Sequence, residues 1–317
     1  MADVLVVADD LTGANAAAAG FARSGLRAVT ASAADRADVV AEMVSRFDVV
    51  VATTDSRHAP AEVARDRVAA VVQAGWPSRL VCNRIDTTLR GNIGASTQAV
   101  RDEVAALTGS RVVVLCAPAH PAANRHTIGG TQLLGGRRLE ETEVARDART
   151  PMRTSDIVEI LGQQAAMAAT VVPMATVTGD GDALTAAIRT ALDEGAEVIV
   201  ADAMTVDHLD RVAVAAVAAS RGTDLVWVTS DPGPASVAMA RALGIQRDTP
   251  GAPLLVVSGS ATELTRTQLR QLAVDRQARV HRAPTVGDTA VPDLDATAAV
   301  LDRAIRDAGP DDVVVLA

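Results

Sequence analysis

Two adjacent carboxylates follow the first hydrophobic segment of this chain. The strand-like run Val4–Ala8 leads directly into Asp9 and Asp10. Thr12 and Gly13 then open a segment with helical spacing. Ligands of open α/β sheets bind beyond the carboxyl ends of the strands, and the free N–H groups at a helix start favour anions. A polar turn with a helix N-cap accounts for one carboxylate more easily than for both, so the motif predicts a ligand site.

A second polar cluster lies at residues 53–58, immediately after a hydrophobic run that ends at residue 52. It contains Arg57, whose planar guanidinium can bind a carboxylate through two parallel hydrogen bonds. The alternative is an ordinary surface ion pair, and the sequence favours neither interpretation. Its place after a strand makes Arg57 a candidate clamp for an anionic ligand.

A third cluster occupies residues 83–94, after the strand-like run 79–82. It holds two arginines, one aspartate, two threonines and two glycines, and it opens a helical segment. Such a composition packs poorly in a core but suits an anion or a polyol. The alternative is a solvated loop in which Asn92 caps the helix. The density of polar groups favours a binding site.

A fourth cluster, formed by Ser258, Gly259 and Ser260, lies at a strand-to-helix turn. Backbone N–H groups at such a turn can cradle a phosphate. The cluster is not a Walker A loop, because the lysine of that motif is absent. Taken by itself, it fits a plain turn better than a phosphate site.

Composition narrows the function classes. With 49% hydrophobic residues, the chain can bury a substantial core. The formal net charge of -9 and the lack of a clustered basic face argue against a nucleic-acid partner. There is no leader-like start, no apolar run of membrane-spanning length and no zinc spacing, and Cys82 and Cys116 lie in apolar runs typical of buried thiols. We therefore expect a globular cytoplasmic protein without a membrane partner and without a metal-ligand cluster.

Short valine-rich runs alternate with alanine-rich amphipathic segments, which is typical of βαβ architecture. This pattern predicts strands over 4–8, 27–31, 48–52, 79–82 and 111–116, and helices over 15–23, 37–45, 61–73 and 92–106. The alternation breaks over 117–152, a span without a clear period, and loops of that length are usually lids or binding loops. It resumes from 155 onward. We expect an α/β fold of two α/β domains with mostly parallel sheets and a cleft between them, divided into 1–243, a linker over 244–253, and 254–317.

The motifs at residues 8–14, 84–94 and 258–260, in this order, resemble those of the four-carbon acid sugar kinase family. Segments within 117–125, 141–151 and 202–207 support the resemblance, which spans essentially the whole chain. It implies ATP-dependent phosphorylation of the terminal hydroxyl of a sugar acid such as threonate, erythronate or 3-oxo-tetronate. The first domain is then the substrate domain and the second is part of a nucleotide domain. Mg²⁺ is implied by the chemistry of phosphoryl transfer rather than by any ligand cluster.

The resemblance, together with the clusters above, gives a set of candidate site residues. Those for the sugar acid are Asp9, Asp10, Arg57, Arg84, Ile85, Asp86, Thr87, Arg90 and Asn92, and those for ATP are Ser258, Gly259 and Ser260. Arg57 and Arg84 are the expected clamps for a carboxylate or a phosphate. Either Asp10 or Asp86 is the expected base, and the sequence does not choose between them.

Two positions and the end of the sequence depart from the family pattern. Arg84 stands where the family usually has lysine, and Asn124 stands where it usually has glycine. The sequence ends at 313–317, before the Gly-Gly-x-Thr-type loop of the family, so we expect either a truncated reading or a short homologue with impaired nucleotide binding. The rival hypothesis is a non-catalytic sugar-acid binding protein. An oxidoreductase is a weaker alternative because no dinucleotide fingerprint follows the first strand. A homo-oligomer is possible, and the sequence does not decide the oligomeric state.

Overall fold

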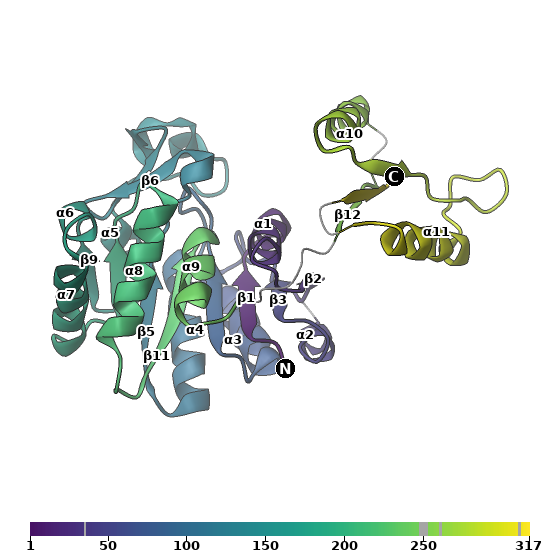
Figure 1. Ribbon diagram of the computed structural model, residues 1–317. Coiled ribbons are helices and arrows are strands. Elements are labelled where there is room, and N and C mark those ends of the chain that lie inside the picture. Colours follow the sequence, from purple (N-terminus) through teal and green to yellow (C-terminus); the bar gives the residue numbers. More distant parts are fainter. Residues whose placement is uncertain (35, 247–252, 260–261, 310–311) are drawn as a thin grey trace. The chain divides into compact units, whose positions relative to one another are not determined.

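The computed structural model describes residues 1–34, 36–246, 253–259, 262–309 and 312–317. By its internal contacts the chain divides into two compact units, Met1–Gln246 and Arg247–Ala317. Each unit contains a parallel sheet with flanking helices (Figure 1). The expected α/β class is therefore confirmed.

An eight-stranded sheet forms the centre of the first unit, in the order β2-β3-β1-β4-β11-β5-β10-β9. Each neighbouring pair is parallel. The strands are β1 (Val4–Ala8), β2 (Ala28–Ser32), β3 (Val49–Thr53), β4 (Leu80–Arg84), β5 (Arg111–Cys116), β9 (Ala169–Val172), β10 (Val198–Ala201) and β11 (Leu225–Asp231). Parallel strands need crossover connections, which the intervening helices supply.

Helices cover both faces of this sheet (Figure 1). Because successive side chains of a strand point to opposite faces, Val4 and Val6 join one core and Leu5 and Val7 join the other. The first core is covered by α1 (Leu11–Ala22), α6 (Met174–Val177), α7 (Gly181–Asp193), α8 (Val206–Ala219) and α9 (Pro234–Ala242), and the second by α2 (Asp38–Met43), α3 (Ala61–Gly75), α4 (Ile93–Thr108) and α5 (Ile157–Gln164). Burial on both faces explains why these strands are continuous apolar runs.

The segment between β5 and α5 contains a small antiparallel sheet, so the prediction of an unpatterned span over 117–152 was wrong. Its elements are η1 (Pro121–Ala123), β6 (Arg125–Ile128), β7 (Thr131–Leu134), β8 (Arg137–Arg138), η2 (Leu139–Glu141) and η3 (Glu143–Arg146). The glycine pairs at 129–130 and 135–136 all have positive φ and connect the strands. Glycine adopts this conformation without a steric penalty, so the two pairs were the signal that periodicity overlooked.

The second unit has a three-stranded parallel sheet in the order β12-β14-β13. Its elements are β12 (Leu254–Val257), α10 (Glu263–Arg276), β13 (Arg279–His281), α11 (Leu294–Arg306) and β14 (Val313–Leu316). Ala278, Val313 and Val315 form its small core. Ser260 lies outside the described residues, as do residues 247–252 of the expected linker.

Cys82 and Cys116 are buried free thiols, as expected. Burial raises the pKa of both to about 12, so both stay protonated at neutral pH. Among the helices in the described part of the chain, none is both long enough and apolar enough to cross a membrane.

Candidate functional site

Three of the predicted clusters meet at the carboxyl ends of neighbouring strands in the large sheet. Strand β1 lies between β3 and β4, and its last residue, Ala8, pairs with Thr53 on one side and Arg84 on the other. Because the strands are parallel, the segments that leave their carboxyl ends emerge side by side. The sheet order therefore joins clusters that are far apart in the sequence.

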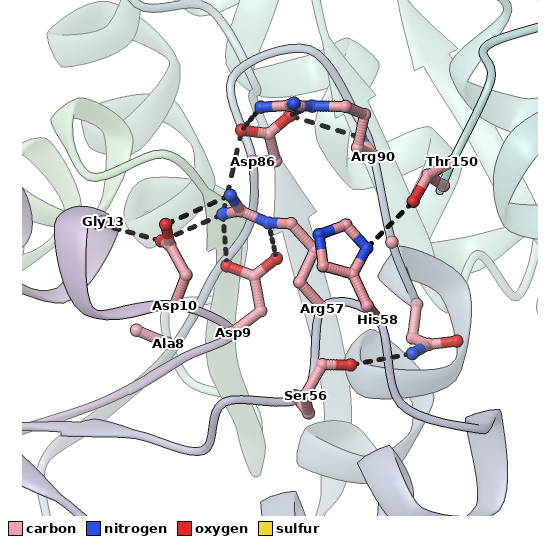
Figure 2. A network of polar contacts seen from close by, with 12 residues as sticks. Ala8, Asp9, Asp10, Gly13, Ser56, Arg57, His58, Asp86, Arg90 and Thr150 are labelled. Carbon is pink, nitrogen blue, oxygen red and sulfur yellow. Dashed lines mark hydrogen bonds and ion pairs between the residues drawn. The ribbon is translucent and has the colours of Figure 1, made fainter. Parts of the chain in front are cut away.

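The guanidinium of Arg57 lies among three carboxylates at these strand ends (Figure 2). Its Nε and Nη2 atoms each donate to an oxygen of Asp9 at 2.7 Å. Its Nη1 and Nη2 atoms lie 3.1 and 2.9 Å from the oxygens of Asp10, and Nη2 lies 3.7 Å from Asp86 Oδ1. The planar fork of Arg57 is thus occupied by carboxylates of the protein.

Burial and neighbouring charges have opposite effects on the pKa values of Asp9 and Arg57. Burial raises the pKa of Asp9 above its ordinary value, and the hydrogen bonds and charge of Arg57 offset this only in part. Burial lowers the pKa of Arg57, but its hydrogen bonds to Asp9 and the charges of Asp9, Asp86 and Asp10 outweigh this effect and leave the pKa raised. The ionised form of Asp9 therefore depends on Arg57.

Asp86 is held by the loop that contains it. Its Oδ2 atom accepts the hydroxyl of Thr88 at 2.6 Å and Nε of Arg90 at 2.8 Å. Burial alone would raise the pKa of Asp86, but the Arg90 bond, the charge of Arg57 and the Thr88 bond lower it well below the usual range. Asp86 therefore stays ionised at neutral pH and is a weak base.

Asp10 has two partners of different kinds. It is the N-cap of α1, where its Oδ1 atom accepts the backbone N–H of Gly13 at 2.8 Å, and it also contacts Arg57. Its side chain is 26% exposed, compared with 14% for Asp9 and 7% for Asp86. Asp10 therefore caps the helix, as the alternative interpretation predicts, and also contacts the arginine of the cluster. It is the most accessible of the three carboxylates.

Arg84 is buried against the start of α1, with a side chain that is 8% exposed. Its Nη1 atom lies 3.5 Å from Asp10 Oδ1 and 3.9 Å from Asp9 Oδ1, and its Nε atom has no hydrogen-bond partner in the described structure. A Cβ atom built on Gly13 would lie 1.9 Å from Nη1, so only glycine leaves room for this guanidinium. Arg84 therefore retains donor capacity for an anion, unlike Arg57.

Side-chain amides fix the loops around this cluster. Nδ2 of Asn92 donates to the carbonyl oxygens of Ser56 and Ala59 at 2.9 and 2.8 Å, which ties the loop after β3 to the start of α4. Nε2 of Gln164, from α5, donates to the carbonyl oxygen of Gly91 at 2.9 Å. The sequence analysis did not identify Gln164, because a glutamine at a helix end has no local signature.

Two further candidates contribute through the backbone. The side chain of Ile85 is buried in the core, and its N–H donates to the carbonyl oxygen of Asp231 at 3.1 Å. The carbonyl oxygen of Thr87 accepts Nε2 of the buried Gln132 at 3.0 Å. These contacts shape the loop after β4 rather than present side chains to a ligand.

The remaining candidates belong to the second unit. The N–H of Ser258 donates to the carbonyl oxygen of Leu316 at 2.8 Å, so this donor is used within the sheet. Gly259 is exposed, and a Cβ atom built on it meets no described atom within 4 Å. Among the described residues, no group of three or more His, Cys, Asp or Glu side chains could hold a metal ion.

A pocket of about 560 Å³ includes Arg57 in its lining. Its lining residues are Arg57, His58, Ala59, Gly91, Asn92, Arg149, Thr150 and Gln164. Nδ1 of His58 lies 3.2 Å from the hydroxyl of Thr150, which links the loop after β3 to the long segment before α5 (Figure 2). The polar lining and the volume suit a small polar ligand.

Comparisons with known proteins agree with the sequence motifs. The model of the sugar-binding N-terminal domain family matches residues 4–241. A D-erythronate kinase of Heliobacterium modesticaldum is 36% identical over 273 residues, covering 85% of this chain and 60% of that protein. A D-threonate kinase of Salmonella typhimurium is 34% identical over 309 residues, covering 95% of this chain and 65% of that protein. The chain thus spans less than two thirds of the length of these relatives.

A similar solved structure comes from Bordetella bronchiseptica. It is a domain of unknown function with bound citrate, crystallised as a domain-swapped dimer, and it is 27% identical with a TM-score of 0.60. The match covers 99% of this chain and 74% of the other. The chain belongs to the four-carbon acid sugar kinase family, and it matches the sugar-binding N-terminal domain of that family over residues 4–241.

Proposed function

We propose that this chain binds a four-carbon sugar acid and phosphorylates its terminal hydroxyl with ATP as the donor. The observation that carries the proposal is the cluster of Asp9, Asp10 and Asp86 around Arg57, at the strand ends and next to a polar pocket. The names of the relatives, D-erythronate kinase and D-threonate kinase, support this substrate class. Threonate, erythronate and 3-oxo-tetronate are the candidate substrates.

Asp10 is the proposed base. Phosphoryl transfer depends mainly on positioning and on stabilising charge, with a carboxylate near the attacking hydroxyl. The hydroxyl oxygen forms a bond to the γ-phosphorus while the bond from that phosphorus to the ADP oxygen breaks, and the hydroxyl proton passes to Asp10. Asp10 suits this role better than Asp86, because it is more exposed and because the lowered pKa of Asp86 makes it a weaker proton acceptor.

The arginines have separate proposed roles. Arg57 holds Asp9 and Asp10 in place, since both of its edges are occupied by them. Arg84 has an unpartnered Nε atom in the described structure and is the proposed donor to the transferring phosphoryl group. Thr87, Arg90 and Asn92 have proposed structural roles, because their hydrogen bonds hold the loops around the site in place.

ATP and Mg²⁺ are implied by the kinase chemistry. The hydroxyl of Ser258 and the open backbone at Gly259 are the proposed contacts to ATP, because the N–H of Ser258 is already bonded. The described residues do not fit a magnesium site, since the carboxylates of the cluster are bonded to arginines and backbone N–H groups. No step of the reaction is therefore assigned to the metal.

Calorimetry and a coupled ADP-release assay test this function together. We expect the chain to bind D-erythronate, D-threonate or 3-oxo-tetronate and to release ADP when ATP is added. Binding of a sugar acid without ATP binding or turnover would support the rival hypothesis of a non-catalytic binding protein. Absence of binding by all three acids would contradict both hypotheses.

A substitution at Gly13 tests the placement of Arg84. We expect Gly13→Ala to weaken sugar-acid or phosphate-analogue binding by about tenfold, since the new methyl group displaces the guanidinium and its charge-assisted hydrogen bonds. The melting temperature should not fall, because the displaced group ends a flexible side chain and alanine favours a helix. Gly162→Ala in α5 is the control, because its added Cβ meets no atom of the described residues within 4 Å. Unchanged affinity in Gly13→Ala would remove Arg84 from the binding site.

A further inference from the structure

The carboxylate of the proposed substrate needs a cation that is free to bind it. Arg57 is an obvious choice by type, but its fork already holds Asp9 through two bonds of 2.7 Å and also contacts Asp10. A substrate carboxylate would have to displace these protein carboxylates. Arg84 is buried under Gly13, on the side of α1. Neither arginine therefore offers a free, exposed fork.

A different arginine lines the same pocket. Arg149 is exposed, lines the pocket together with Arg57 and His58, and its guanidinium has no partner within the described part of the chain. Among the residues that the structure describes, no carboxylate side chain lines this pocket. A planar guanidinium with free donors matches a carboxylate through two parallel hydrogen bonds.

Asp147 fixes the turn that presents Arg149. Its Oδ1 atom accepts the backbone N–H groups of Arg149 and Thr150 at 3.0 and 2.8 Å, and its Oδ2 atom accepts Nη1 of Arg90 at 3.0 Å. The backbone bonds from Thr150 and Arg149, followed by the Arg90 bond, lower the pKa of Asp147 to about 2. Since Arg90 also binds Asp86, one arginine connects the carboxylate cluster to this turn.

We propose that Arg149 binds the carboxylate of the sugar acid and that Asp147 is the residue that positions it. The inference rests on the proposed function and assigns a direction to the substrate. The acid end lies at Arg149, and the rest of the substrate extends toward Arg57, which lines the same pocket and contacts the proposed base Asp10. A polyol of the same length that lacks the carboxylate gains nothing from Arg149, so this residue selects acids over neutral polyols.

Calorimetry with D-erythronate and with erythritol, its neutral polyol counterpart, tests the role of Arg149. We expect Arg149→Met to weaken D-erythronate binding by about ten- to a hundredfold, because a charge-assisted bidentate contact is lost, and to leave erythritol binding unchanged. Arg146→Met is the matched control, since it removes an equal charge from an exposed position of the same segment that does not line the pocket. Arg149→Lys should restore only part of the affinity.

The outcomes separate this inference from the proposed function. Wild-type affinity for D-erythronate in Arg149→Met, or an equal loss for erythritol, overturns the inference while the proposed function stands. Failure of the wild-type chain to bind any four-carbon sugar acid overturns both.

The double variant Asp147→Asn/Arg149→Met tests the positioning role. Asp147→Asn should weaken D-erythronate binding more than erythritol binding, because it loosens the turn that holds Arg149 in addition to the contact with Arg90. Once Arg149 is absent, Asp147→Asn should add less loss than it causes alone, since the two residues act mainly through one contact. Additive losses in the double variant would show that Asp147 acts independently of Arg149 and would overturn its positioning role.

Discussion

Replacing Arg57 by methionine is expected to lower the free energy of unfolding by about 3–5 kcal/mol at neutral pH, which is the usual cost of leaving a buried charge without its partner. The side chains of Arg57 and Asp9 are only 12% and 14% exposed, so little water reaches Asp9 to replace the guanidinium. Asp10 and Asp86 would also face each other without the cation between them. Chemical denaturation measures the effect. Arg36→Met, in an exposed pair with Asp38, is the control and should leave the free energy of unfolding nearly unchanged.

The loss in the free energy of unfolding caused by Arg57→Met should depend on pH. Without Arg57, burial holds the pKa of Asp9 in the folded variant above the unfolded value of about 3.9. The folded variant then binds protons more readily than the unfolded chain. The loss in its free energy of unfolding, relative to the wild type, is therefore largest at neutral pH and becomes smaller as the pH falls through the raised pKa. Asp9→Asn/Arg57→Met should recover part of the loss at neutral pH. A deficit that is equal at neutral and acid pH would contradict the account.

The strand ends and their polar clusters were predictable because they depend on local sequence. A continuous apolar run such as Val4–Ala8 predicts a strand buried on both faces, and the residues after it predict a site. The order of the strands is not local. The placement of β1 between β3 and β4 decides that Asp9 meets Arg57, and no period in the sequence encodes that neighbourhood.

The environment of each carboxylate was equally beyond the sequence. Asp10 and Asp86 are alternatives of equal standing in the sequence, since each is an aspartate after a strand. The structure separates them, because Asp86 accepts bonds from Thr88 and Arg90 in a buried loop while Asp10 keeps the larger exposed fraction. Burial and partners, rather than residue type, set the acidity of Asp86.

For the segment over 117–152, one expectation was wrong and the other is untested. Its glycine pairs build a small sheet that periodicity did not predict. Its expected role as a binding segment stays a prediction, which the presence of Arg149 and Thr150 in the pocket lining supports. The link from Arg90 to Asp147 joins residues that are 57 positions apart, so only the folded chain shows it.

Replacing Asp10 by asparagine is expected to lower kcat by about 10²–10⁴-fold, the usual contribution of a positioned general base. Asparagine caps a helix about as well as aspartate, so the bond to the N–H of Gly13 and the start of α1 should persist, and the melting temperature should change little. The Kd for the sugar acid should change less than kcat, because the lost group acts mainly on the proton in the transition state. ADP release with saturating sugar acid and ATP measures kcat, and calorimetry measures Kd.

A matched variant at the second carboxylate completes the experiment. Asp86→Asn weakens the hold on Arg90 and through it on Asp147, so we expect the Kd for the sugar acid to rise together with a smaller fall in kcat. Turnover near the wild-type level in Asp10→Asn, with loss in Asp86→Asn, would move the base to Asp86 despite its lowered pKa. If both variants kept full turnover, no carboxylate of this cluster would accept the proton. The attacking hydroxyl would then lose its proton only after the bond to phosphorus had largely formed, as a loose transition state allows.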